Sequence, residues 1–209
     1  MARYTDASCK QCRRERQKLF LKGTKCFTDK CPIEIRNYPP GQHGVAKRFK
    51  LSDYAVQLRE KQKVKRTYGL LEKQFRNYFA DASRKKGATG ENLVQFLERR
   101  FDNVLYRMGL APSRKAARQL ITHRHFTING KVVNIPSFLL KAGDSIQVRE
   151  NSKKLDVIHD AMKRMKDSLM PTYLSLDKAN LSGVFLKEPE RMDVNFIGNE
   201  QLIVELYSK

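Results

Sequence analysis

The sequence contains no tryptophan, and it has no apolar run near the ~20 residues that a helix needs to cross a bilayer. Its first residues, Met1 to Tyr4, lead into no apolar stretch of the kind that a secretory signal contains. We therefore expect a cytoplasmic protein without a transmembrane segment. Because tryptophan is missing, the aromatic side chains are those of 8 Tyr and 11 Phe residues.

Acidic residues are scarce: 22 Asp and Glu stand against 42 Lys and Arg, which gives a formal net charge of +20. Basic residues outnumber acidic ones by 13 to 4 in residues 1–50, by 10 to 6 in 51–98 and by 10 to 3 in 99–150. Residues 151–209 hold 9 of each kind. A protein that neutralises a polyanion concentrates its cations where the polyanion lies. This distribution predicts a nucleic acid as the partner.

Cysteine is absent after residue 31, and the four present are Cys9, Cys12, Cys26 and Cys31. In a reducing compartment such a cluster is more typical of a metal site than of disulfides. The two close pairs, with a longer loop between them, have the spacing of a closed tetrahedral Zn²⁺ site. Cys31 precedes a proline, which resembles iron–sulfur ligation. We predict Zn²⁺, with an iron–sulfur cluster and four free thiols as the alternatives.

Motifs of catalysis are also missing. The sequence has no Gly-x-Ser-x-Gly, no Gly-x-x-x-x-Gly-Lys and no paired carboxylates in an apolar setting. We therefore predict that the chain is not an enzyme. Two other classes stay open as alternatives: an RNA-modifying enzyme or regulatory protein that carries an RNA-binding module, and a zinc-dependent DNA-binding regulator. The first would need a further large domain, and the second a helix that reads bases and an element that forms dimers.

Hydrophobic periodicity predicts helices after a turn-rich first segment that shows no helical period and no core of its own. Ser52 and Ser113 have the character of N-caps. The expected helices cover residues 52–68, 71–87, 91–108, 113–123 and 154–166.

After the fourth of these helices, the spacing of apolar residues changes from the helical period of 3.6 to the strand period of 2. Residues 126–133 predict a hairpin of two short strands around Asn129-Gly130, a pair that favours a type I′ turn. Further strands are expected at residues 145–149, 173–176, 184–186 and 202–207.

The helix after Ser113 is amphipathic. Ala116, Ala117, Leu120 and Ile121 share one side of it, and Arg114, Lys115 and Arg118 share the other. We expect these three cations to lie on an open face. Fixed cations on a rigid element suit the phosphates and 2′-hydroxyls of an A-form RNA helix, which is bound mainly through its shape.

Residues 99–150 resemble a small RNA-binding module that is shared by a ribosomal protein and several RNA enzymes. The stretches that carry this resemblance are Phe101–Gly109, Ser113–Leu120, Ile128–Val133, Asn134–Ser137 and Gly143–Asp144. The module alone implies that the chain binds structured RNA.

The flanking segments resemble the family of bacterial small-subunit ribosomal protein number four. The matching stretches are Tyr38–Gly44, Ser52–Ala55, Gln74–Asn77, Ala82–Gly87 and Asn199–Leu202. The resemblance implies a structural protein of the small ribosomal subunit that binds 16S ribosomal RNA at a junction and acts early in assembly. It also implies a position beside the fifth small-subunit protein and messenger RNA, with an influence on decoding accuracy.

Together these observations predict an α+β fold. We expect a metal-bound basic arm in residues 1–48, a helical domain in 49–91, and an α/β domain in 92–209 whose helices pack on a small, mainly antiparallel sheet. The α/β domain contains the RNA-binding module at 99–150 and a neutral tail at 151–209.

The side chains that we expect to contact RNA are basic or polar. They are Arg13, Arg14, Arg36, His43, Arg48, Lys50, Arg59, Lys61, Lys63, Lys65, Arg66, Arg76, Arg84, Lys85, Lys86, Arg99, Arg100, Arg107, Arg114, Lys115, Arg118, Gln119, His123, Arg124, Asn129 and Lys131. A second interpretation of His43, as a spare metal ligand, is less favoured because it lies in a Pro-Gly turn.

Overall fold

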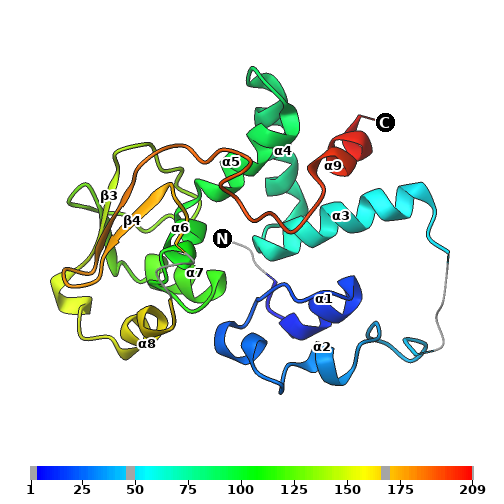
Figure 1. Cartoon of the computed structure of the whole chain (residues 1–209), viewed down its shortest axis with the longest axis horizontal. Coiled ribbons are helices and arrows are strands. Elements are labelled where there is room, and N and C mark those ends of the chain that lie inside the picture. The colour runs from blue at the N-terminus through cyan, green and yellow to red at the C-terminus, as the bar shows by residue number, and fades with distance from the viewer. Residues whose placement is uncertain (1–3, 46–49, 166–169, 209) are drawn as a thin grey trace. The chain divides into compact units, whose positions relative to one another are not determined.

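The computed structural model describes residues 4–45, 50–165 and 170–208, and the chain divides into two compact units. The first unit comprises Met1–Leu93 and Phe196–Lys209, and the second comprises Val94–Asn195. Figure 1 labels the α-helices of both and the strands β3 and β4. The three-part division expected from the sequence, with boundaries after residues 48 and 91, stays a prediction.

Three short helices form the arm at the start of the first unit. They are α1 (Ser8–Glu15), the 3₁₀ helix η1 (Gly23–Phe27) and α2 (Pro32–Ile35). The arm has a small core, contrary to the sequence expectation, made by Cys12, Leu19, Leu21, Cys31 and Ile33 with Ile197 packed against it. Periodicity could not detect this core because its members come from several short elements and the loops between them.

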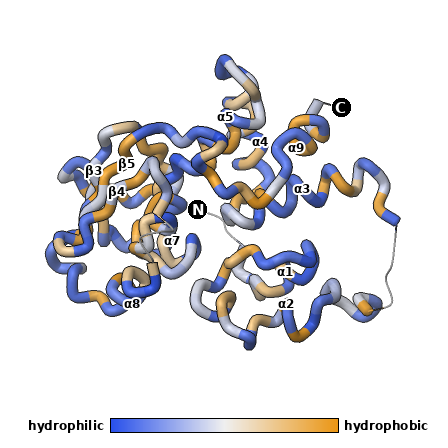
Figure 2. The backbone as a smooth tube through the Cα atoms, in the orientation of Figure 1, coloured by the Kyte–Doolittle hydropathy of each residue, from blue (hydrophilic) through white to orange (hydrophobic). Residues whose placement is uncertain are grey.

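Two longer helices and a C-terminal one complete the first unit: α3 (Asp53–Thr67), α4 (Glu72–Arg84) and α9 (Glu200–Tyr207). Ser52 caps α3 as predicted, because its Oγ accepts a hydrogen bond from the backbone N–H of Ala55 at 3.4 Å. Much of α1 and α3 is hydrophilic, as the blue tube in Figure 2 shows. These polar helices therefore depend on contacts with neighbouring elements rather than on a broad apolar face.

Helix α9 occupies the segment 202–207 that the sequence assigns to a strand, so that prediction is wrong. The side chain of Asn199 caps the helix by accepting hydrogen bonds from the backbone N–H groups of Gln201 and Leu202. Packing on α3 buries Ile203, and the ring of Tyr207 lies 4.5 Å from that of Phe79 on α4. The N-cap and the tertiary packing together stabilise a helix here, although this short apolar run by itself favours a strand.

The helix predicted for residues 91–108 is two helices, α5 (Thr89–Glu98) and α6 (Phe101–Arg107). Arg100 between them has an extended backbone and bridges Leu139 in antiparallel fashion. The backbone N–H of Phe101 donates to the carbonyl of Phe138, and that of Leu140 donates to the carbonyl of Arg99. The break therefore arises from pairing with a distant segment, which no local pattern reveals.

A five-stranded antiparallel sheet forms the second unit together with α6 and α7 (Arg114–Thr122). Its strands are β1 (Phe126–Ile128), β2 (Lys131–Val132), β3 (Ser145–Val148), β4 (Leu174–Asp177) and β5 (Ser182–Phe185), in the order β2-β1-β3-β5-β4. Asn129 and Gly130 have φ of 49° and 77°, which confirms the turn predicted between β1 and β2.

One face of this sheet is buried. Phe126 pairs with Val148 and Ile128 with Ile146, and all four side chains are buried, whereas Gln147 between them is exposed. The helices α6 and α7 lie beside the sheet in Figure 1. This arrangement confirms the α+β class and the antiparallel sheet.

The neutral tail contributes the 3₁₀ helix η2 (Glu150–Ser152), α8 (Asp156–Arg164) and the strands β4 and β5. The strands predicted at residues 173–176 and 184–186 are confirmed to within a few residues. Gly183 is required on β5, because a Cβ there would lie 2.7 Å from the carbonyl oxygen of Ser175 and 3.0 Å from Met108. Across the described ranges, no helix has both the length and the apolarity that a membrane span requires.

Candidate nucleic-acid interface

Helix α7 carries the three cations that the sequence places on one open face. Ser113 caps the helix as predicted, because its Oγ accepts from the backbone N–H of Ala116 at 3.2 Å. Arg114, however, is buried: its Nε donates to Asn103 Oδ1 at 2.8 Å, and its guanidinium lies 4.5 Å from the ring centre of Tyr106. The expectation of an open face is therefore wrong for Arg114. A substitution there would disturb the packing of α6 on α7 as well as any RNA contact.

Asp102 of α6 holds two arginines. Its carboxylate accepts from Arg100 Nε at 3.1 Å, from Arg100 Nη2 at 2.8 Å and from Arg118 Nε at 2.6 Å. Asp102 and Arg100 are buried, and Arg118 is partly buried. Charge-assisted bonds of this length fix the direction of both guanidinium groups.

Glu98, at the end of α5, is a second buried acid. It accepts hydrogen bonds from Asn103 Nδ2 at 2.7 Å and from Arg107 Nη2 at 2.9 Å. The hydroxyl of Tyr173 donates to the same carboxylate at 2.8 Å. Asn103 also accepts from Arg114, so Arg114 belongs to the group around Glu98. We name the groups around Asp102 and Glu98 together the acid–arginine network; its members are Glu98, Arg100, Asp102, Asn103, Arg107, Arg114, Arg118 and Tyr173.

Exposed polar side chains lie at the C-terminal end of α7 and along the hairpin. His123, Arg124, Asn129 and Lys131 are all exposed. Arg149, which the sequence analysis did not select, donates through Nη1 to the carbonyl of Arg124 at 3.2 Å. A guanidinium that holds this backbone turn adds a further cation to the region.

Two histidines lie in the same region. The ring nitrogen Nδ1 of His125 lies 2.9 Å from Ser152 Oγ, and the ring centres of His123 and His125 are 6.0 Å apart. Burial, with His123 and Arg149 nearby, lowers the pKa of His125. The lowered pKa favours the neutral imidazole, so His125 contributes less positive charge to this region than an ordinary histidine.

Several predicted cations of α3 are bound to acids within the first unit. Glu15, at the end of α1, has an almost fully buried carboxylate that contacts Arg66 and lies 3.3 Å from Arg59 Nη1. Burial raises the pKa of Glu15, while Arg66 and Arg59 act in the opposite direction. These two arginines hold the arm helix α1 against α3.

Glu72 of α4 binds two more of the predicted cations of α3. Its carboxylate lies 2.5 Å from Lys61 Nζ and 2.9 Å from Lys65 Nζ, and it accepts from the hydroxyl of Tyr207 at 3.1 Å. Partial burial by itself raises the pKa of Glu72, but the hydrogen bonds from Lys61 and Lys65 outweigh that effect and lower the pKa to about 2. Glu72 thereby joins α3, α4 and α9.

We expect the first unit to lose stability as the pH falls from about 5 towards 2. The folded pKa of Glu72 lies below the ordinary glutamate value of about 4.3, so its contribution is complete above that value and disappears as the pH falls through the folded pKa. Because the Glu72 side chain is 47% exposed, the contribution should not exceed ~1 kcal/mol. Urea unfolding at pH 6 and pH 2 measures it, with Glu72→Gln as the comparison. The variant should be less stable than the wild type only at pH 6, and an equal gap at both pH values would contradict this assignment.

The predicted RNA-contacting residues differ in accessibility. The exposed ones are Arg14, Arg36, His43, Lys50, Arg76, Arg84, Lys85, Lys86, Gln119, His123, Arg124, Asn129 and Lys131. The partly buried ones are Arg13, Arg59, Lys63, Lys65, Arg66, Arg99, Arg107, Lys115 and Arg118, and the buried ones are Lys61, Arg100 and Arg114. Arg48 lies outside the described residues. As RNA contacts, all of them stay predictions.

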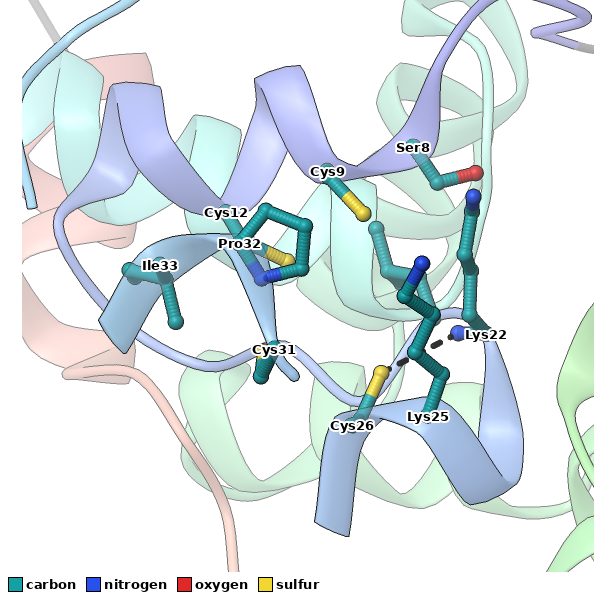
Figure 3. A pocket seen from close by; sticks show the side chains of 10 residues that line it. Ser8, Cys9, Cys12, Lys22, Lys25, Cys26, Cys31, Pro32 and Ile33 are labelled. Atoms are coloured by element: carbon teal, nitrogen blue, oxygen red, sulfur yellow. Dashed lines mark hydrogen bonds between the residues drawn. The ribbon is translucent and has the colours of Figure 1, made fainter. Parts of the chain in front are cut away.

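The four cysteines line one small pocket of the arm, together with Lys22 and Lys25 (Figure 3). All four are free thiols, and Cys12, Cys26 and Cys31 are buried. The backbone N–H of Lys22 donates to Cys26 Sγ at 3.4 Å. Burial raises the pKa of Cys12 and of Cys26, which favours the thiol over the thiolate.

Comparison with known proteins decides the family. The family model described as "Ribosomal protein S4/S9 N-terminal domain" matches residues 3–98, and the one described as "S4 domain" matches residues 99–146. Similar proteins named "Small ribosomal subunit protein uS4" occur in Syntrophobacter fumaroxidans, Geobacter sulfurreducens and Thermodesulfovibrio yellowstonii. They are 58%, 56% and 53% identical to this chain over 209 residues, which is the full length of both chains in each comparison.

The chain belongs to the uS4 family. The resemblance drawn from the sequence motifs is thereby confirmed. The two family-model matches meet between residues 98 and 99, within the acid–arginine network, whose acid Glu98 closes the first match and whose Arg100 and Asp102 lie in the second. In this uS4 chain the hydrogen bonds that Asn103 and Arg107 donate to Glu98 join the ends of the two matched regions.

The prediction of a metal in the arm of this uS4 chain is wrong, both for Zn²⁺ and for the iron–sulfur alternative. Among the residues that the structure describes, no group of three or more His, Cys, Asp or Glu side chains is arranged to hold a metal ion. The spacing of the cysteines along the chain does not determine whether their sulfur atoms point towards one another in the folded arm. Cys12 and Cys31 instead pack as small apolar side chains in the core of the arm.

Sequence reasoning missed the acids that organise this uS4 chain. Glu15, Glu98 and Asp102 are not among the predicted site residues, although they hold arginines that are. The sequence feature that could have identified Asp102 is the scarcity of acids around it, because it is one of only three acids in residues 99–150. An isolated acid in a strongly basic segment is a candidate for a buried ion pair, since acids without such a partner are seldom fully buried.

Proposed function

We propose that this chain is a structural constituent of the small subunit of the cytoplasmic ribosome and binds ribosomal RNA directly. The observation that carries the proposal is its full-length membership of the uS4 family. The basic surplus of the first 150 residues and the exposed cations of both units support it.

Binding follows from cations whose positions are set before RNA arrives. Asp102 and Glu98 fix the guanidinium groups of Arg118 and Arg107 on neighbouring helices. Arg124, Lys131 and Arg149 remain exposed beside them in the chain. A rigid set of cations neutralises phosphates that converge in folded RNA, and it does so through the shape of the RNA rather than through base edges.

The finer parts of the proposal follow from the family resemblance. The RNA would be 16S ribosomal RNA, bound at a junction of helices early in assembly. The neighbours would be the fifth small-subunit protein and messenger RNA near the path by which it enters, with a contribution to decoding accuracy. The equal numbers of acids and bases in residues 151–209 support a protein-facing role for that tail. We propose no catalytic activity.

Competition between two nucleic acids tests the proposal. The purified full-length chain is mixed with a transcript of the 5′ domain of 16S ribosomal RNA and with duplex DNA of equal length at one salt concentration. We expect the chain to prefer the transcript and to protect nucleotides around a helix junction in footprinting. Equal affinity for both nucleic acids, with no protected junction, would contradict the proposal.

A further inference from the structure

Two phenylalanines of the arm form an exposed aromatic pair. The ring centres of Phe20 and Phe27 are 5.0 Å apart and their planes are inclined by 29°, which is a stacked arrangement. Phe27, at the end of η1, is 69% exposed, and Phe20 is partly buried. Phe20 therefore supports one side of Phe27, whose ring remains largely open to solvent.

The backbone places Phe20 in this position. Its neighbours Leu19 and Leu21 are both buried in the core of the arm, whereas Phe20 is only partly buried and is not part of that core. Phe20 also has φ of 50°, a left-handed conformation that is rare and strained for a bulky residue. The core of the arm thus holds a strained residue whose ring lies against Phe27.

The surroundings of the pair are cationic. Lys22 and Lys25 precede Phe27, Lys30 follows it, and all three are exposed. Asp29 is the one acid between Arg16 and Lys30, and the remaining acid nearby, Glu34, contacts Lys18. An open aromatic ring with three exposed lysines within five residues of it along the chain is complementary to a polyanion that carries flat aromatic groups.

We propose that Phe27, supported by Phe20, stacks on an unpaired base of the ribosomal RNA. The inference rests on the proposed function and adds a mode of contact to it, since it concerns a base rather than phosphates. Aromatic side chains provide stacking platforms for unstacked bases, and each such base contributes enough that an alanine substitution weakens binding by about 5- to 150-fold. An apolar protein surface would match the ring but not the exposed lysines next to it in the chain.

The absence of tryptophan from the chain makes a direct test possible. The full-length F27W variant contains one tryptophan, at the proposed contact, so its fluorescence reports that position alone. We expect the 16S 5′-domain transcript to quench the emission, because a base stacks on the indole. A fully paired RNA duplex should leave the emission unchanged even where it binds, since its bases already stack on one another.

Affinities for the same transcript test the energetics. We expect Phe27→Ala and Phe27→Leu to bind about 5- to 150-fold more weakly and Phe27→Tyr to bind like the wild type, with the salt dependence of binding unchanged because no phosphate contact is lost. Ile35→Ala is the matched control. Ile35 is 67% exposed on the same arm, and this variant should retain full affinity. Circular dichroism melting confirms that each variant folds.

The outcomes separate this inference from the proposed function. If the wild type ignores the transcript, the proposed function fails and the stacking proposal fails with it. If the wild type binds while the tryptophan emission of F27W does not change, or while Phe27→Leu binds like the wild type, stacking is overturned and the proposed function stands. Quenching that occurs only after other ribosomal proteins are added would assign the aromatic pair to a protein neighbour and would also overturn the proposal.

Discussion

Asp102→Ala is expected to lower the free energy of unfolding of the second unit by ~3–5 kcal/mol, because it leaves the buried Arg100 guanidinium without its carboxylate. Arg100 is 0% exposed and its partner carboxylate 1% exposed, so solvent cannot replace the lost contact. For a unit of about 100 residues, each kcal/mol corresponds to roughly 4–8 °C of melting temperature. Calorimetry or a melting curve should therefore show a loss of well over 10 °C.

The matched controls for this prediction come from the same unit. Arg99 contacts Glu188, whose side chain is 41% exposed, and Glu188→Ala should cost less than ~1 kcal/mol. The double variant Asp102→Ala with Arg100→Met removes both charges of the pair and should recover part of the loss, since the buried Arg100 guanidinium is no longer left without its carboxylate. If Asp102→Ala costs no more than Glu188→Ala, the pair does not hold the second unit together.

The affinity for ribosomal RNA should fall ~10³–10⁵-fold between 50 and 200 mM salt, as expected when about six to ten phosphates are neutralised. Each phosphate contact releases condensed counterions, so the logarithm of the binding constant falls linearly with the logarithm of the salt concentration. Titrations at four or five salt concentrations measure the slope. A flat response would contradict binding through phosphates.

The exposure of a lysine side chain predicts whether its removal changes the slope of this salt dependence. Lys86 and Lys131 are exposed, so Lys86→Ala and Lys131→Ala should each reduce the slope by about one where the lysine contacts a phosphate. Lys61 is buried against Glu72, and Lys61→Met should leave the slope unchanged. If all three substitutions change the slope equally, accessibility in the free chain does not predict the RNA contacts.

Local chemistry predicted much of the fold. The hairpin around Asn129-Gly130 and the helix starts at Ser52 and Ser113 follow from side chains that act on their own backbone within a few residues. The amphipathic period of α7 correctly placed Ala117 and Ile121 in the core. These features depend on few neighbours, so one sequence is enough to find them.

The features that were predicted wrongly all depend on contacts with residues that are far away in the sequence or outside the local pattern. The break at Arg100 requires the segment around Leu139, and α9 takes a segment expected to be a strand because it packs on α3. Arg114 is buried because its side chain donates a hydrogen bond to Asn103 and packs on the ring of Tyr106. In each case the deciding contact joins residues that local patterns do not connect.

The cysteines and the cations show the same limit in the candidate site. Counting basic residues identified the kind of partner, but it did not distinguish Lys86, which solvent reaches, from Lys61, which an acid holds. Spacing suggested metal ligands, whereas the described residues contain no group arranged to hold a metal ion.

The amino-acid order alone determined the family, the polyanionic class of partner, the turn at Asn129-Gly130 and the helix caps at Ser52 and Ser113, because the chemistry of each such turn and cap is contained in a few adjacent residues. Tertiary structure decided which cations remain available, because only the folded chain brings Glu15, Glu72, Glu98 and Asp102 against particular arginines and lysines. An acid withdrawn from water needs a cation as its partner, and where that cation is itself buried, as Lys61 and Arg100 are, RNA cannot reach it.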